Sequence, residues 1–219
     1  MTITIAIDGP AAAGKGTLGA RLAETYGLAK LDTGLLYRAT GFKVVAGGGD
    51  PEDAAVAEAA ARALDPADLA NEALRTDEAA QAASKVSAIP GVRAALLDFQ
   101  HEFAANPPLL DDGSPAKGAL LDGRDIGTTV CPDAHVKLFI SASTEVRAKR
   151  RFKELQDRGL EAIYARVLED MKERDARDSN RSASPLAAAD DAFVLDTSDL
   201  NADAAYAAAV EFITTKNLF

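Results

Sequence analysis

The segment at residues 9–17, Gly-Pro-Ala-Ala-Ala-Gly-Lys-Gly-Thr, constrains the fold of this chain more than any other stretch. It follows residues 2–7, a short run rich in β-branched side chains that predicts a strand, and it opens residues 15–26, where apolar residues recur at helical spacing. The Gly-x-x-x-x-Gly-Lys spacing is typical of a phosphate-binding loop, whose backbone N–H groups and following helix N-terminus surround an anion. We therefore expect a strand–loop–helix unit that holds nucleotide phosphates, with Lys15 supplying a full positive charge.

The residue after the loop lysine departs from the general pattern. Gly16 stands where Ser or Thr is usual, and Thr17 follows it. Nucleoside monophosphate kinases share this departure, so it favours a kinase. The alternative is a strand–turn–helix connection with incidental glycines. A GTPase is disfavoured, because the sequence has no Asn-Lys-x-Asp motif for reading guanine.

Short strands alternate with helices along the rest of the chain. Further strands are predicted at 29–32, 118–122, 136–142 and 193–196. Helices are predicted at 15–26, 34–46, 144–157, 160–178 and 201–215, and residues 50–105 are helical in character with breaks at Pro66 and Pro90. This alternation indicates an α/β fold in which helices flank a five-stranded parallel sheet.

The charge balance limits the partners of the chain. There are 24 Lys and Arg against 34 Asp and Glu, a formal net charge of −10, which disfavours non-specific binding of nucleic acid. No apolar run reaches 18 residues and the N-terminus lacks a basic signal region, so we expect no membrane association. One cysteine and two histidines offer neither a disulfide nor a structural metal cluster, and a cytoplasmic location fits.

Three segments gather cations at predicted strand ends or on one helix face. They are residues 32–38, which contain Thr33 and Arg38; residues 121–128, which contain Arg124 and Asp125; and residues 172–181, which contain Arg174, Arg177, Asp178 and Arg181. Loops at the carboxyl ends of parallel strands face the ligand crevice, so these side chains are candidates for binding a second anionic substrate. An ordinary surface arginine, a salt-bridged turn and a solvated charged helix are the respective alternatives.

Taken together, these motifs resemble those of bacterial cytidylate kinases. The matching segments, in family order from residue 5 to 181, are IAIDGPAAAGKGT, LDTGLLYR, AASKVSAIPGVRAAL, LDGRDIGT, VCPDAHVKLF and KERDARDSNR, and VLD at 194–196 extends them. The resemblance implies a P-loop kinase that transfers the γ-phosphoryl group of ATP to CMP or dCMP. Two alternatives are another small-molecule kinase, of the shikimate or gluconate type, and a non-catalytic ATP-binding module.

The resemblance also implies a domain organisation within one kinase chain of residues 1–219. The core is expected at 1–46, 106–156 and 179–219, with a monophosphate-binding insertion at about 47–105 and a lid at about 154–170. The family commonly carries a small β-rich insertion, but only eleven residues, 65–75, are available here, so we expect a reduced, helical acceptor region. With no coiled-coil pattern in the sequence, we expect a monomer.

Site roles follow from the resemblance at matching positions. The residues implied to bind ATP phosphates are Gly9, Pro10, Ala11, Ala12, Ala13, Gly14, Lys15, Gly16 and Thr17. Arg38, Arg124 and Arg174 would grip the CMP phosphate beside Thr33, and Asp178 would meet the ribose. Arg181 would lie at the reaction centre, so the implied catalytic residues are Lys15, Arg124, Arg174 and Arg181. Arg150 and Arg151, which precede the lid, are further candidates for the ATP phosphates.

Cytosine recognition is implied for Ser84, Arg93 and Asp125. Cytosine presents an amino donor beside two acceptors, so a carboxylate and two donors complement it. Uracil would place O4 against the carboxylate, and a buried acceptor left unpaired costs about 1–3 kcal/mol. Asp125 is therefore expected to discriminate against UMP.

Mg²⁺ is the cofactor expected with ATP, because phosphoryl transfer requires charge neutralisation on the β and γ oxygens. Thr17 is the best hydroxyl ligand candidate, and Asp8 is a weaker one in the second coordination shell. No general base is needed, because a phosphate monoester with a second pKa of ~6 is already mostly dianionic at neutral pH.

Overall fold

A computed structural model describes residues 2–181 and 183–219; residues 1 and 182, which belong to the expected core ranges, lie outside the described part. Five strands form one parallel sheet, namely β1 (Ile3–Asp8), β2 (Leu28–Asp32), β3 (Gly118–Asp122), β4 (Val136–Ser141) and β5 (Phe193–Asp196). Their order across the sheet is β2-β3-β1-β4-β5. The predicted α/β fold with a five-stranded parallel sheet is confirmed.

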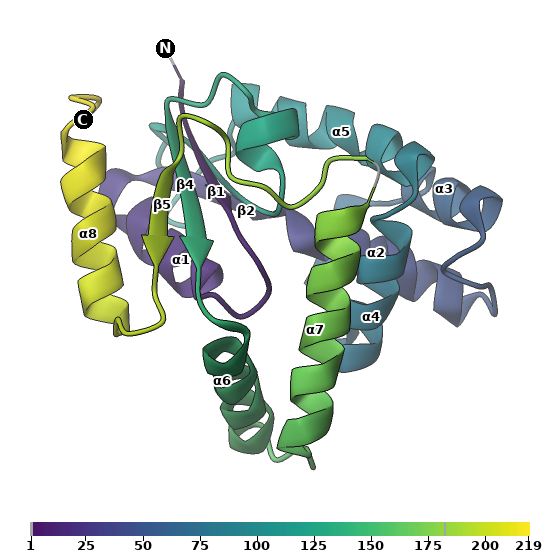
Figure 1. Cartoon of the computed structure of the whole chain (residues 1–219). Helices are drawn as coiled ribbons and strands as arrows, with labels where there is room; N and C mark the ends of the chain where they lie inside the picture. The colour runs from purple at the N-terminus through teal and green to yellow at the C-terminus, as the bar shows by residue number, and fades with distance from the viewer. Residues whose placement is uncertain (1, 182) are drawn as a thin grey trace.

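Helices cover both faces of the sheet and extend beyond it (Figure 1). They are α1 (Lys15–Tyr26), α2 (Thr33–Ala46), α3 (Ala54–Arg62), α4 (Asp77–Val86), α5 (Pro90–Ala105), α6 (Thr144–Asp157), α7 (Tyr164–Asn180) and α8 (Ala202–Thr214). Three short helical turns are η1 (Pro66–Ala70), η2 (Glu72–Arg75) and η3 (Ile126–Val130).

Alternate residues of the central strands enter two separate apolar cores. Ile5 and Ile7 of β1 pack with α1 and α8 in one core, whereas Ala6 points to the opposite side. There Ala6 joins Leu36 of α2 and Leu96 of α5. Successive side chains of a strand point to opposite faces, so these short apolar strands need cover on both sides.

Residues 47–105, whose backbone is described throughout, form helices and turns but no strand. Within them, residues 65–75 make only the turns η1 and η2, capped by the side chains of Asp65 and Asn71. The prediction of a helical stretch without a small sheet is thus confirmed. Helix α5 contacts β3, so this stretch shares the apolar core of one sheet face.

The helix predicted at 160–178 was misplaced at its start, since α7 begins only at Tyr164. Residues 159 and 160 instead close the preceding helix. Gly159 has a φ of 72°, and the backbone N–H of Leu160 donates to the carbonyl of Leu155 at 3.0 Å. This is the bonding pattern that ends a helix at a left-handed glycine, so the chain must turn before α7 can begin.

The carboxyl ends of β1, β2 and β3 lie at one edge of the sheet, because the three strands are parallel and adjacent. The loop at 9–14, helix α2 and residues 123–125 follow these ends. Helices α6 and α7 project past this edge as a hairpin, and α7 runs beside α4 (Figure 1). In the described part of the chain, no helix has both the length and the apolarity that crossing a membrane requires.

Candidate active site

The loop between β1 and α1 is shaped for close approach of an anion. Gly9 has a φ of 142°, and a Cβ there would lie 2.0 Å from the carbonyl oxygen of Ile140, so no other residue fits. Ala12 also has a positive φ, 58°, at a position where glycine is frequent in such loops. Lys15 Nζ donates to the Pro10 carbonyl at 2.9 Å, which folds the lysine back over the loop. The first N–H groups of α1 need partners that the helix itself does not supply, and phosphate oxygens suit them.

Two aspartates lie beside Lys15 that the sequence interpretation did not single out. Asp32 and Asp122 end β2 and β3 and are partners in the strand register. Lys15 Nζ lies 4.0 Å from an Asp122 carboxylate oxygen, and both side chains are buried. Burial, followed by the charge of Arg124, lowers the pKa of Lys15 to about 7 although the two aspartates oppose this shift. Burial likewise raises the pKa of Asp122.

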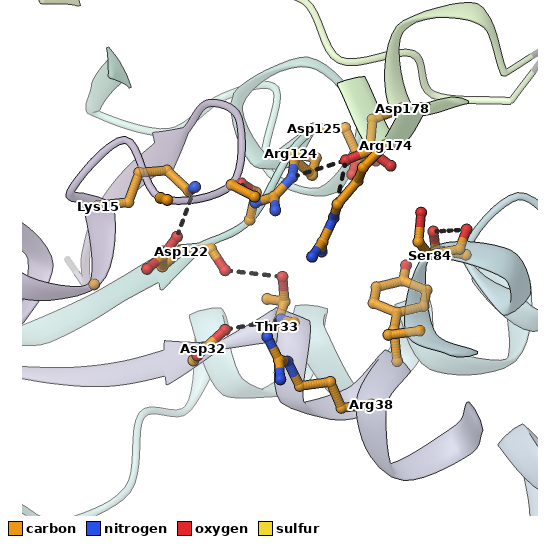
Figure 2. Close-up of a pocket in the computed structure, with 18 of the residues that line it drawn as sticks. Lys15, Asp32, Thr33, Arg38, Ser84, Asp122, Arg124, Asp125, Arg174 and Asp178 are labelled. Carbon is orange, nitrogen blue, oxygen red and sulfur yellow. Dashed lines mark hydrogen bonds and ion pairs between the residues drawn. The ribbon is translucent and has the colours of Figure 1, made fainter. Parts of the chain in front are cut away.

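A single cleft brings together the acceptor-site residues predicted from three distant segments. Its lining contains all eight predicted CMP-binding residues, Thr33, Arg38, Ser84, Arg93, Arg124, Asp125, Arg174 and Asp178, together with Lys15 and Arg181. Six cationic and four acidic side chains face this space, in a protein whose net charge is −10. Figure 2 shows Arg38, Arg124 and Arg174 in the middle of the cleft, between Lys15 at one end and Ser84 at the other.

The central arginines are arranged for an anion that is larger than one carboxylate. Arg124 and Arg174 share Asp178, with Nε atoms 3.3 and 3.8 Å from the same carboxylate oxygen. The Nε of Arg174 is buried and has no hydrogen-bond partner among the described residues. Burial and then the neighbouring Arg124 charge lower the pKa of Arg174 to about 10. Guanidinium groups so crowded favour a dianionic ligand between them.

The Ser84 end of the cleft is built around a buried carboxylate. Asp125 is ion-paired with Arg93 and lies 3.4 Å from Arg181 Nη2. The guanidinium of Arg93 also stacks 5.5 Å above the ring of Tyr37 and donates to the Ser87 carbonyl at 3.3 Å. Charged, hydrogen-bonding groups are therefore held in fixed positions around a space walled by an aromatic ring.

The turn that carries Arg124 and Asp125 depends on Asp8. Both carboxylate oxygens of Asp8 accept backbone N–H groups, from Ile126 and Gly127, each at 2.7 Å. These bonds fix η3 immediately after Asp125, a turn that no sequence pattern predicted. Asp8 therefore has a structural role in holding this turn. Its expected role in the second coordination shell of a magnesium ion stays a prediction. Burial raises its pKa to about 6 in spite of the two hydrogen bonds.

The chain is similar to known proteins over nearly its whole length. A family profile described as cytidylate kinase matches residues 5–215. The cytidylate kinase of Paramagnetospirillum magneticum is 64% identical over 216 residues, covering 99% of this chain and 100% of the relative. This chain belongs to the cytidylate kinase family. The cytidylate kinase of Rhodospirillum rubrum is 58% identical over 213 residues, which cover 97% of this chain and 98% of that protein.

One solved structure shares the fold at much lower sequence similarity. An uncharacterised protein from Eubacterium ventriosum aligns over 99% of both chains with a TM-score of 0.53 and 14% identity. The likeness between the two structures is therefore one of fold.

A second, more apolar pocket lies on the other side of the loop of this cytidylate kinase family member. Its lining residues are Ala13, Gly14, Thr17, Leu18, Ile140, Arg150, Thr197, Leu200, Asn201, Ala202 and Ala205. Arg150 donates to the Thr197 hydroxyl at 3.0 Å and to the Thr197 carbonyl at 2.6 Å, and its Nη1 lies 3.4 Å from the Ala13 carbonyl of the loop. Its expected contact with the ATP phosphates stays a prediction. The pocket has the apolar walls and few polar groups that a nucleotide base requires.

The neighbouring arginine has a different environment. Arg151 is ion-paired with Asp77 of α4 and, at 2.7 Å, with Glu154. In this conformation it therefore contacts the acceptor side of the cleft and not the loop. Arg147, which sequence reasoning missed, contacts the loop through the Ala11 carbonyl at 3.3 Å and is bound to Asp175 of α7. No motif marks Arg147, because its role depends on a fold in which α6 passes the loop.

Proposed function

We propose that CMP or dCMP occupies the arginine-lined cleft and that ATP lies along the loop at 9–17, so that the two nucleotides meet end to end beside Lys15. The family reaction is transfer of the γ-phosphoryl group of ATP to CMP and dCMP. One observation carries the proposal. Lys15, Arg38, Arg124 and Arg174, predicted from separate motifs, line one continuous cleft.

The phosphate of the acceptor is assigned to the centre of this cleft. Arg124 and Arg174 already share a carboxylate, and the buried Nε of Arg174 lacks a hydrogen-bond partner among the described residues. Arg38 lies nearby, where its Nη1 donates to the Leu74 carbonyl at 2.8 Å. A phosphate dianion would exchange these contacts for stronger charge-assisted bonds. Asp178 would then be free to accept a ribose hydroxyl.

The base is assigned to the end of the cleft formed by Ser84, Arg93 and Asp125. Asp125 offers carboxylate oxygens to the cytosine amino group, while Ser84 and Arg93 offer donors to its acceptors. Asp125 forms ion pairs with Arg93 and Arg181, which hold its carboxylate in place at this end of the cleft. An ionised carboxylate accepts hydrogen bonds only, so it selects an amino group over a carbonyl oxygen.

Catalysis in this arrangement is positioning and charge stabilisation. Lys15, Arg124, Arg174 and Arg181 surround the path of the phosphoryl group and neutralise the charge that spreads over its oxygens. The acceptor oxygen is already anionic, so no side chain has to remove a proton. Closure of the α6–α7 hairpin, the predicted lid at about 154–170, would exclude water and direct the phosphoryl group to CMP.

The residues beside Lys15 fit a magnesium ion. Asp32 and Asp122 offer carboxylate oxygens at the ends of adjacent strands, and Mg²⁺ binds through one or two carboxylates together with substrate phosphates. A Cβ on Gly16 would lie 3.9 Å from an Asp122 oxygen, so Asp122 faces the position where other phosphate loops carry a hydroxyl. Thr17 lines the neighbouring apolar pocket and is the hydroxyl candidate. When bound, the ion supplies charge neutralisation to the ATP phosphates.

The assembly and location of the enzyme are part of this proposal. A monomer, the expected active species, would supply both pockets by itself, because the predicted site residues that line them come from one chain. ATP and CMP are cytoplasmic metabolites, and we place the enzyme there with no nucleic-acid or membrane partner.

A coupled assay of ADP release with CMP, dCMP, UMP and AMP tests the proposal. We expect turnover with CMP and dCMP, weak turnover with UMP, and a loss of about 100- to 1,000-fold in kcat for Lys15→Ala, because removing one key stabilising group costs about 3–4 kcal/mol. Lys30→Ala is the matched control, since Lys30 lies on β2 outside the cleft lining. Near-normal turnover by Lys15→Ala, or phosphorylation of shikimate or gluconate but not CMP, would contradict it. ATP binding without any turnover would indicate the non-catalytic module.

A further inference from the structure

Arg177 lines neither pocket, but it forms a hydrogen bond with Ser84 at the end of the acceptor cleft assigned to the base. Its Nη1 donates to Ser84 Oγ at 2.7 Å. Arg177 lies on α7 and Ser84 on α4, 93 residues apart in the sequence. Ser84 is only 3% exposed and lines the cleft, whereas Arg177 is not part of the lining. Arg177 thus approaches Ser84 from behind.

This contact fixes the hydrogen-bonding role of the Ser84 hydroxyl. A serine hydroxyl can donate one hydrogen bond and accept others, and it rotates to suit its partners. A guanidinium only donates, so the Oγ lone pair facing Arg177 is an acceptor and the hydroxyl proton points elsewhere. Among the described residues, no protein acceptor takes that proton. A free donor is consequently presented where the hydroxyl meets the cleft.

The charge of Arg177 strengthens this preference. A guanidinium 2.7 Å away polarises the O–H bond toward donation and opposes the approach of a second N–H donor to the same oxygen. Cytosine presents acceptors at N3 and O2, whereas uracil keeps the O2 acceptor but presents an N3–H donor in place of the N3 acceptor. A Ser84 hydroxyl held as a donor toward N3 of the base therefore suits cytosine and opposes uracil. A hydroxyl free to rotate would serve either.

We propose that Arg177 is a specificity-determining positioning residue, which holds Ser84 as a hydrogen-bond donor and so disfavours acceptor bases that present an N–H group to it. The inference rests on the proposed placement of the base between Ser84, Arg93 and Asp125. This effect is distinct from the selection of the cytosine amino group by Asp125. Here the selecting group is a hydrogen-bond donor, Ser84, and Arg177 acts on it from another helix. Arg177 itself touches neither the base nor the reacting atoms.

The decisive measurement is the ratio of kcat/KM for CMP to kcat/KM for UMP in Arg177→Gln. We expect the ratio to fall about tenfold, mostly through a higher KM for CMP, with kcat for CMP within about threefold of wild type. Arg177→Lys should recover part of the ratio, because an ammonium group also only donates. Lys172→Gln is the matched control, since it removes one positive charge from the exposed side of the same helix. Melting temperatures identify any variant that is simply unfolded.

A double-mutant cycle with Ser84→Ala shows whether Arg177 acts through Ser84. In the Ser84→Ala background, Arg177→Gln should change the CMP to UMP ratio by less than twofold, because no hydroxyl remains to be positioned. Equal effects in both backgrounds, or an unchanged ratio in Arg177→Gln, would overturn the inference while the proposed function stands. A wild-type enzyme that phosphorylates UMP as readily as CMP would overturn both.

Discussion

Lys15 Nζ and a carboxylate oxygen of Asp122 lie 4.0 Å apart, and both groups are almost entirely withdrawn from water. The charge state of Lys15 therefore depends on the charged groups around it, including any bound phosphate. Burial and the Arg124 charge lower the pKa of Lys15 to about 7 in the ligand-free protein. ATP phosphates would favour the charged ammonium and raise that pKa again.

We therefore predict that ATP binding above pH 7 takes up a proton. At pH 8 Lys15 is largely neutral in the free enzyme, whereas the complex requires it charged, so uptake should approach one proton per ATP. Calorimetric titration in two buffers of different ionisation enthalpy measures this number. Lys15→Arg keeps a permanent charge and should take up far less. Equal uptake by the two proteins would show that another group titrates.

A second prediction concerns Asp125. Asp125→Asn should lower kcat/KM for CMP and shift the CMP to UMP preference by about 5- to 160-fold, the range that corresponds to about 1–3 kcal/mol for a mismatched buried hydrogen bond. The same substitution at Asp98, exposed on α5, is the control and should leave the preference unchanged. Kinetic assays with each nucleotide give the answer. A variant with an unaltered preference would exclude Asp125 as the base-reading carboxylate.

The third prediction is a pH dependence of stability caused by Asp8. Folding raises its pKa from 3.8 to about 6, so the neutral form is favoured in the folded protein. The resulting stability is fully present below pH 4 and is lost as the pH rises through 6, by about 3 kcal/mol in total. Asp8→Asn has no proton to lose, and its unfolding free energy should lack this decline. Urea denaturation of both proteins from pH 4 to 7 measures the difference, and parallel curves would contradict the assignment.

The fourth prediction concerns the ion pair between Arg151 of α6 and Asp77 of α4. It joins the α6–α7 hairpin to the acceptor side, but Asp77 is more than half exposed, so its loss should cost about 0.5–1 kcal/mol. Asp77→Asn should raise the KM for CMP about two- to fivefold and increase ATP hydrolysis in the absence of CMP. Glu78→Gln, a neighbouring exposed position in the same helix turn, is the control. An unchanged KM for CMP in Asp77→Asn would show that the pair makes no contribution to acceptor binding.

The sequence could predict the features that depend on local pattern. The glycines and the lysine at 9–17 have the spacing of a phosphate-binding loop, which predicted the position of Lys15. The strands around this loop alternate with helices, which predicted the parallel sheet. Arg38, Arg124 and Arg174 follow strand ends or share a helix face, and the topology brings them to one cleft. These residues could be predicted because each lies at a recognisable place in a strand–helix pattern, and parallel strands bring such places to one edge of the sheet.

The features that escaped prediction depend on contacts between distant segments. Asp32 and Asp122 become neighbours only through the register of β2 and β3, which no local motif specifies. Arg177 meets Ser84 because α7 passes α4, and Asp8 bonds a turn 118 residues away. The start of α7 was misplaced because Leu160 bonds back to Leu155, a closing contact that apolar spacing does not reveal.

The apolar core that α5 shares with β3 has a consequence for any attempt to simplify this protein. Ala119 and Leu121 of β3 are completely buried beneath the side chains of that core. Deleting residues 47–105 to obtain a minimal ATP-binding domain would expose one side of the sheet, and such a fragment would aggregate or unfold. The recognition of the acceptor and the stability of the central sheet are therefore inseparable in this chain.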